Sequence, residues 1–143
     1  MSLSDDLSRF SKLFSVLEDD ARKKLMSLSK KKVFVKGDVI CREGEQGGDF
    51  FVLTKGTVSV SGDDLLGRKF ELATLKAGEF FGELAALTGQ RRQATVTAAE
   101  DVEVMCFPPA AVAEVVKTSA PAMEVMQKAG LHRTEDTMKK MME

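Results

Sequence analysis

The chain begins with apolar residues at a helical spacing. Residues three or four positions apart lie on one face of a helix, and the apolar positions that follow this spacing are Leu7, Phe10, Phe14 and Leu17, and then Ala21, Leu25 and Leu28. The carboxylates of Glu18, Asp19 and Asp20 precede the second set and suit a helix N-terminus. We therefore predict N-terminal helices within residues 4–30, followed by a solvated turn at Lys30–Lys32.

The pattern changes to short β-type runs over residues 31–107. Runs rich in Val, Phe, Thr and Ile alternate with turns that contain glycine, and these runs are Val33–Val35, Phe50–Thr54, Val58–Val60, Phe70–Leu72, Val96 and Val102–Phe107. We predict one of the turns at Gly62–Asp64. Several short strands at this spacing predict a roll, barrel or sandwich rather than a βαβ sheet.

Residues 108–143 return to a helical pattern. Pro108 and Pro109 end the last strand and open a helix that runs to Lys117, because proline is tolerated at the first helical position. Ser119 then caps a longer helix with Pro121 in its first turn. Along this helix, residues at three- and four-residue steps form a stripe, which we interpret as core packing because methionine fills irregular gaps. The stripe consists of Met123, Met126, Gly130, Thr134, Met138 and Met141. We expect residues 1–143 to form a single domain.

Composition narrows the class of protein. Apolar residues make up 43% of the 143 positions and charged residues 30%, as in a globular protein. The net charge of −1 argues against a nucleic-acid partner. No apolar run is long enough to span a bilayer, so we expect no membrane contact. Cys41 and Cys106 are far apart and are interpreted as free thiols in a reducing, cytoplasmic compartment. With His132 as the only histidine and no nucleophile–base pair, neither a metal site nor an enzyme is expected.

One segment, Lys76–Val96, breaks the β pattern. Its middle, Glu83–Leu87, consists of strong helix formers between Gly82 and Gly89, which predicts one or two turns of helix. Free N–H groups at a helix start beside a glycine bind anions. Arg91 and Arg92 follow soon after in the sequence, and each guanidinium can bind an anion through two nitrogens. Glu83 suits a ribose hydroxyl, so the chemistry indicates a nucleotide. A solvated turn with two arginines fits the same residues.

Two stretches of this segment resemble a known motif. Phe81-Gly82-Glu83-Leu84-Ala85 and Arg92-Gln93-Ala94-Thr95-Val96 are similar to the phosphate-binding cassette of cyclic-nucleotide-binding domains. That family includes protein kinase A regulatory subunits, catabolite-activator-type regulators and cyclic-nucleotide-regulated channels. Leu13–Leu17 resembles its entry helix, Lys36–Gly44 its first strand pair and Gly47–Gly56 its next strands. The resemblance implies a mainly β domain with flanking helices (α+β): an antiparallel β-roll, or jelly roll, with N-terminal helices, a short cassette helix and two C-terminal helices.

The resemblance also implies roles for individual residues. The ligand would be cAMP or cGMP, with cAMP favoured and no cofactor needed. Arg92 would neutralise the cyclic phosphate, and Glu83 would bind the ribose 2′-hydroxyl. The full ligand-binding set would be Phe81, Gly82, Glu83, Leu84, Ala85, Arg92, Gln93 and Ala94. The last helix would move over the base as a lid through Leu131, His132, Arg133 and Thr134, and would report the ligand to an effector domain or to a protein bound at the terminal helices.

Three departures from the family pattern leave alternatives open. Arg91 stands where many members have proline, as in the channel branch. Gly48 stands where many carry an acidic residue, so an acidic partner for Arg92 is not assured. Gln93 replaces a small residue or threonine, and its amide either meets a purine edge or faces solvent. The competing hypothesis is therefore a structural or interaction domain that keeps the roll without binding a nucleotide.

Overall fold

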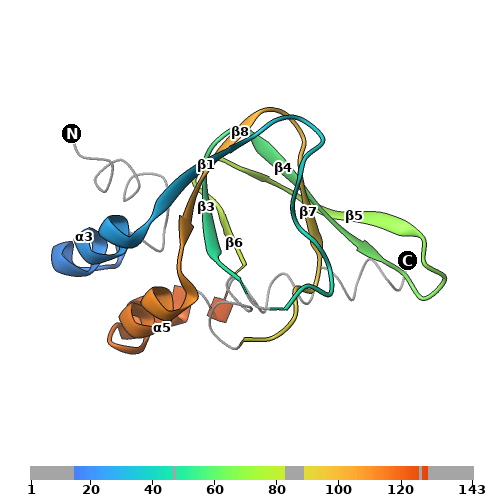
Figure 1. Ribbon diagram of the computed structural model, residues 1–143. Helices are drawn as coiled ribbons and strands as arrows, with labels where there is room; N and C mark the ends of the chain where they lie inside the picture. The colour runs from blue at the N-terminus through green and yellow to red at the C-terminus, as the bar shows by residue number, and fades with distance from the viewer. Residues whose placement is uncertain (1–14, 47, 83–88, 126, 129–143) are drawn as a thin grey trace.

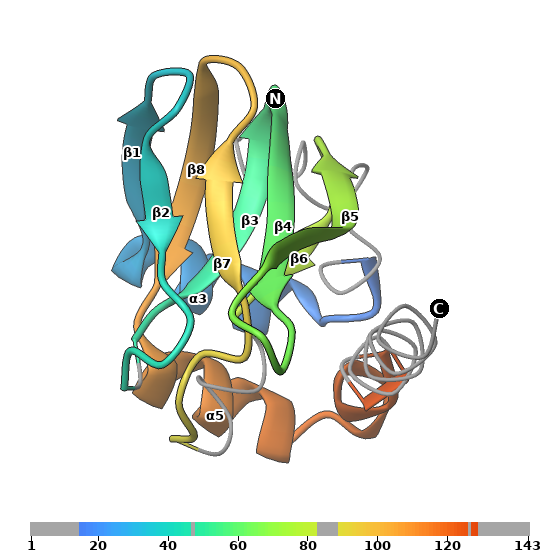
Figure 2. The same ribbon diagram turned by 90° about the vertical axis from the view of Figure 1, so that its right-hand side faces the viewer.

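The computed structural model describes residues 15–46, 48–82, 89–125 and 127–128. Two four-stranded antiparallel sheets form a β-roll (Figure 1), as the sequence and the resemblance predicted. The first sheet has the order β1-β8-β3-β6, with bounds β1 (Lys30–Phe34), β8 (Val102–Phe107), β3 (Phe50–Lys55) and β6 (Phe80–Phe81). The second has the order β2-β7-β4-β5, with bounds β2 (Val39–Cys41), β7 (Thr95–Ala98), β4 (Thr57–Asp63) and β5 (Lys69–Lys76). Figure 2 shows the second sheet in front of the first.

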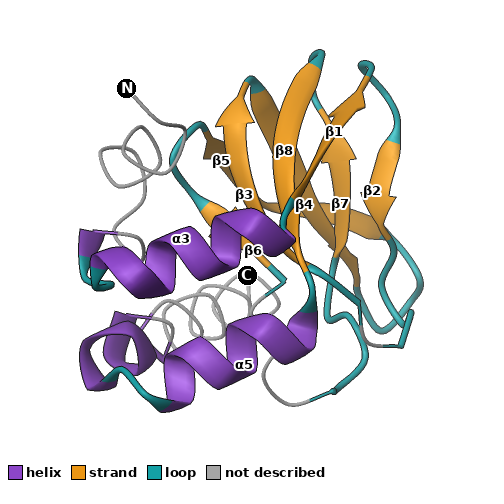
Figure 3. Ribbon diagram, turned by 60° about the vertical axis from the view of Figure 1, so that its left-hand side comes forward, coloured by secondary structure: helices purple, strands orange, loops and turns teal. Residues whose placement is uncertain are grey.

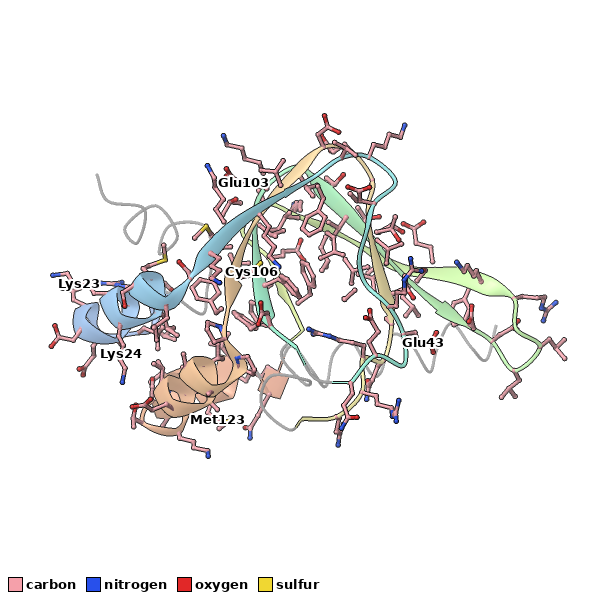
Figure 4. All side chains as sticks on the ribbon, in the orientation of Figure 1. Lys23, Lys24, Glu43, Glu103, Cys106 and Met123 are labelled. Carbon is pink, nitrogen blue, oxygen red and sulfur yellow. The ribbon has the colours of Figure 1, made fainter. Side chains whose placement is uncertain are left out.

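Two helices cover the outer face of the first sheet (Figure 3). Helix α3 (Asp19–Leu28) starts at its acidic turn, and α5 (Pro109–Lys117) starts at Pro109 with Pro108 as N-cap, both as predicted. Lys24 of α3 lies on the side toward α5 (Figure 4), and its Nζ donates to Glu114 Oε1 at 2.7 Å. The two helices therefore pack as a pair against one face of the sheet.

The first sheet separates two cores, because successive side chains of a strand point to opposite faces. The core on its outer face, which we call the helix-side core, contains Leu17, Leu25, Phe50, Val52, Phe80, Met105, Phe107, Ala111, Val112, Val115, Val116 and Ala122. The core between the two sheets, which we call the inner core, contains Cys41, Phe51, Leu53, Val58, Leu75, Phe81, Val96, Ala98, Val102, Val104 and Cys106. Figure 4 shows Cys106 inside the roll.

Two predicted turns are wrong. Lys30–Lys32 is part of β1, where Lys30 pairs with Cys106 of β8, so the helical zone ends before Lys30. The lysine side chains are exposed, as predicted for solvated residues, but an edge strand needs only its backbone for pairing. The Gly62–Asp64 prediction also placed its turn too early, because Gly62 and Asp63 continue β4.

The β4–β5 turn is instead closed by backbone bonds, Asp64 N to Arg68 O at 2.9 Å and Gly67 N to Asp64 O at 3.0 Å, together with the side chain of Asp64. Its Oδ1 accepts from the backbone N–H groups of Leu66 and Arg68, both at 2.9 Å. Such a bond from an aspartate to a nearby N–H replaces ladder pairing and reverses the chain. The turn is therefore set by a hydrogen bond that glycine content alone does not reveal.

At the C-terminal end, Ser119 caps the next helical segment as predicted. Its Oγ accepts from Ala122 N at 3.3 Å, and residues 120–125 are helical. The apolar positions before Ser15 and after Lys128 lie outside the described residues. None of the helices that the structure describes is long and apolar enough to cross a membrane.

Candidate functional site

Arg92 is the buried charged residue of the described ranges, with 8% of its surface exposed. It precedes β7, and its backbone is fixed on both sides: its N–H donates to Glu45 O at 2.7 Å, and its carbonyl accepts from Gly44 N at 2.8 Å. The loop after β2 is also tied to β7, since Glu43 N donates to Thr95 Oγ1 at 3.0 Å. Figure 4 shows Glu43 on this loop. The backbone hydrogen bonds therefore fix the direction in which the Arg92 side chain points away from the main chain.

The Arg92 guanidinium has one satisfied and one unsatisfied terminal nitrogen. Nη2 donates to Asp49 O at 2.8 Å, and Cζ lies 5.5 Å from the centroid of the Phe51 ring. Nη1 is fully buried and finds no acceptor among the described residues. Buried polar groups are almost always hydrogen-bonded, so an unpaired cationic donor marks a place where an anion fits.

Two glycines, Gly48 and Gly82, lie directly beside the two terminal nitrogens of Arg92. A Cβ on Gly48 would lie 2.5 Å from Arg92 Nη2, and a Cβ on Gly82 would lie 2.5 Å from Nη1. Both glycines have a positive φ, +110° and +86°, which side chains rarely adopt. Gly48, which has no side chain to supply a carboxylate, therefore leaves the space that the guanidinium occupies.

The two adjacent arginines have different environments. Arg91 is exposed, bridges to Gln46, and donates from Nη1 to Gly44 O at 3.0 Å on the outer loop. Only Arg92 reaches the interior of the roll. The residue types and their spacing did not distinguish Arg91 from Arg92, whereas the family resemblance pointed to Arg92.

The other predicted binding residues fall into two groups. Phe81 is 3% exposed and stacks on Phe51 with ring centroids 4.8 Å apart, so its side chain packs in the inner core. Gln93 is exposed and Ala94 half-buried, and within the described ranges the N–H groups of both donate to no other residue. They are two free donors directly after the guanidinium residue. Outside the described residues lie Glu83, Leu84 and Ala85 and the predicted lid residues Leu131, His132, Arg133 and Thr134.

Sequence reasoning missed two contributors to the site. The carbonyl of Asp49 and the ring of Phe51 hold the guanidinium, and neither was singled out. A backbone carbonyl has no sequence signal, because any residue supplies one. Phe51 carried a weak signal, since the second of two adjacent phenylalanines in a strand must face away from the first.

The charge of Arg92 acts on a nearby thiol. Burial raises the pKa of Cys41, while the positive charge of Arg92 lowers it in part. Burial raises the pKa of Cys106, deeper in the roll, to about 11. Within the described part of the chain, no cluster of His, Cys, Asp or Glu could hold a metal ion. The described part of the site is thus a buried guanidinium followed along the chain by two backbone N–H groups.

Comparison with known families agrees with this geometry. The family model of the cyclic nucleotide-binding domain matches residues 31–119, which is more than half of the chain. The chain belongs to the cyclic nucleotide-binding domain family. The match includes both sheets, the Arg92 region and helix α5, and the family is a regulatory one that binds cyclic nucleotides.

Individual relatives carry this domain in larger proteins. The chain is 38% identical over 100 residues to a cAMP-dependent protein kinase regulatory subunit of Debaryomyces hansenii, covering 70% of this chain and 21% of the relative. It is 33% identical over 122 residues to a cyclic nucleotide-gated potassium channel of Rhizobium etli, covering 85% and 32%. The chain thus spans about a fifth to a third of the length of these relatives.

A solved structure shares the fold. The regulatory domain of Toxoplasma gondii PKA, crystallised with cAMP, superposes with a TM-score of 0.80 at 22% identity, covering 90% of this chain and 49% of that one. At this identity the likeness shows the β-roll and its helices. The roles of individual residues must be argued from this chain's own contacts.

Proposed function

We propose that this domain binds a cyclic purine nucleotide, with cAMP favoured over cGMP, and that Arg92 neutralises the cyclic phosphate. The observation that carries the proposal is Arg92 Nη1, a buried cationic donor without an acceptor in the described part of the chain. A phosphate oxygen is the acceptor that best suits a guanidinium. The free N–H groups of Gln93 and Ala94 supply neutral donors for the same anion.

The rest of the binding set follows the family resemblance. Glu83 accepts from the ribose 2′-hydroxyl, and backbone N–H groups near Gly82, Leu84 and Ala85 complete the cradle. Relatives named as a cAMP-dependent protein kinase regulatory subunit and as a cGMP-dependent protein kinase are 38% and 36% identical to this chain, so they support a cyclic purine nucleotide, while the preference for cAMP follows the family resemblance. Gln93 is exposed, so its amide is free to meet either water or the purine.

We further propose that the domain is a sensor rather than an enzyme. Residues 1–143 form one domain, and ligand binding shifts the population toward a state in which the C-terminal helix, through Leu131–Thr134, covers the base. The terminal helices pass this change to an effector domain or a protein partner in the cytoplasm. The kinase and channel relatives, which combine such a domain with much longer chains, support an effector of this kind.

Calorimetric titration with cAMP, cGMP and 5′-AMP tests the proposal. The unmodified protein should bind at least one cyclic nucleotide, and bind 5′-AMP more weakly, because its phosphate is open and more highly charged. Arg92→Ala should weaken binding by about 2 kcal/mol or more, roughly 30-fold, as for loss of a charged hydrogen-bond partner. The matched control is Arg91→Ala, which removes the exposed neighbouring guanidinium and should change affinity far less.

Two results would contradict the proposal. Equal affinity of Arg92→Ala and the unmodified protein would remove the phosphate role of Arg92. Absence of binding, together with an unchanged melting temperature in millimolar cAMP or cGMP, would favour the interaction-domain hypothesis, because a ligand specific to the native state raises that temperature.

A further inference from the structure

The two adjacent phenylalanines of β3 have different partners. Phe50 faces the helix-side core, where its ring lies 5.4 Å from Phe80 and 6.0 Å from Phe107. Phe51 faces the inner core, stacks on Phe81, and lies with its ring under the Arg92 guanidinium at 5.5 Å. The strand therefore carries one purely apolar ring and one ring in contact with a cation.

The contact with Phe51 matters because Arg92 has no ionic partner among the residues that the structure describes. Guanidinium groups stay charged in proteins, and burying a charge without compensation is costly. Throughout the described ranges no carboxylate lies within ion-pair distance of Arg92, and Gly48 has no side chain to offer one. The negative face of an aromatic ring attracts a cation, most strongly where water is excluded.

The remaining neighbours fix the position of the guanidinium but supply no net charge. The Asp49 carbonyl accepts from Nη2, while Gly48 and Gly82 leave just enough room at the two nitrogens. The ring of Phe51, the Asp49 carbonyl and the two glycines together form an uncharged cradle, which holds Arg92 without cancelling its charge.

We propose that Phe51 is a positioning residue for anion binding by Arg92. The ring takes the place of an acidic partner, so that the guanidinium keeps its full charge and its free Nη1 donor for the phosphate. Binding then needs no ion pair to be broken first. This inference rests on the proposed function, since the phosphate is the anion that Arg92 is to bind.

Phe51→Leu tests the role, with Phe50→Leu as the matched control. Both changes remove a buried ring from the same strand, but only Phe51 contacts Arg92. Phe51→Leu should weaken cAMP binding about 5- to 30-fold, the range for a desolvated cation–π contact. Phe50→Leu should stay within about twofold of the unmodified protein, whatever it costs in stability. If Phe51→Leu does not fold, Phe51→Met, whose flexible side chain adapts to irregular gaps, takes its place.

A spectroscopic readout separates positioning from general loosening of the core. In the ligand-free protein, the Nε–Hε resonance of Arg92, identified by its loss in Arg92→Ala, should lie upfield because the guanidinium stands over the ring. Phe51→Leu should move this resonance downfield, and Phe50→Leu should leave it in place.

The inference is overturned if Phe51→Leu changes neither affinity nor resonance, or if Phe50→Leu weakens binding equally. If the unmodified protein binds no cyclic nucleotide, the proposed function fails. The resonance comparison then still decides by itself whether Phe51 positions Arg92, so the two failures are distinguishable.

Discussion

The helix-side core and the inner core lie on opposite faces of one sheet and are built from neighbouring residues. Phe50 and Phe80 enter the first core, and Phe51 and Phe81 enter the second. Among the described residues, the helix-side core contains only apolar side chains, and α3 and α5 close it. The inner core has the buried Arg92 guanidinium against it, above Phe51.

The two cores therefore use buried side chains for different purposes. Each fully buried apolar side chain contributes about 1.5–3 kcal/mol to folding, and the helix-side core has no polar group to offset that gain. Burying a charge makes the folded state less stable, and such a charge is retained where it serves binding. We infer that the helix-side core mainly stabilises the roll, while the inner core supports the ligand site at some expense of stability.

The largest expected effect comes from a substitution that disrupts the helix-side core. Phe107→Ala removes a ring with no exposed surface and should lower the free energy of unfolding by about 3–5 kcal/mol. Urea denaturation measures the loss. At temperatures where the variant is folded, its affinity for cAMP should match that of the unmodified protein. A selective loss of affinity in folded Phe107→Ala would contradict the division between the two cores.

Arg92→Met provides the converse test. The change removes a buried charge but keeps much of its apolar contact, so the ligand-free free energy of unfolding should stay within about 1 kcal/mol of the original. The stabilisation by millimolar cAMP should be much smaller than in the unmodified protein, because the affinity for the ligand falls. A thermal-shift series with and without ligand measures both quantities. A large loss of stability without ligand would show that Arg92 is a structural residue.

A pair of glycine variants sharpens the comparison at equal backbone strain. Gly48→Ala and Gly67→Ala both place a side chain at positive φ, +110° and +77°, which costs about 1–2 kcal/mol of stability. Only at Gly48 does the new Cβ displace Arg92, whereas Gly67 has nothing within 4 Å. Gly48→Ala should therefore also weaken cAMP binding roughly tenfold. Equal affinities of the two variants in calorimetry would rule out the close approach at Gly48.

A further prediction concerns the pH dependence of the inner core. The folded state holds the pKa of Cys106 at about 11, above its ordinary value of 9.0, because of burial. Between these values the unfolded chain releases the thiol proton first, so stability should fall as pH rises from about 9 to about 11. The chain has no tyrosine to ionise in the same range. Urea denaturation of Cys106→Ala should show a shallower fall, and identical pH slopes would exclude this cause.

The sequence predicted much of the fold because local rules govern it. The apolar, β-type run Val102–Phe107, the proline at the start of α5 and the Ser119 cap are short-range signals, and the structure has each of them. The exceptions are instructive. Lys30–Lys32 is polar throughout, and only pairing with β8 makes it a strand. The β4–β5 turn depends on one aspartate side chain, which composition does not distinguish.

For the site, the sequence and its family resemblance predicted which residues bear the chemistry. The resemblance to the cassette motif singles out Arg92 and Gly82, whereas the residue types and their spacing alone also fit a solvated turn. Only the tertiary structure decided how Arg92 is held. Asp49 and Phe51 lie about forty residues away along the chain, and folding brings a carbonyl and a ring to the guanidinium. A carbonyl is present in every residue and a ring packs on either face, so neither contact is specified until the two sheets close.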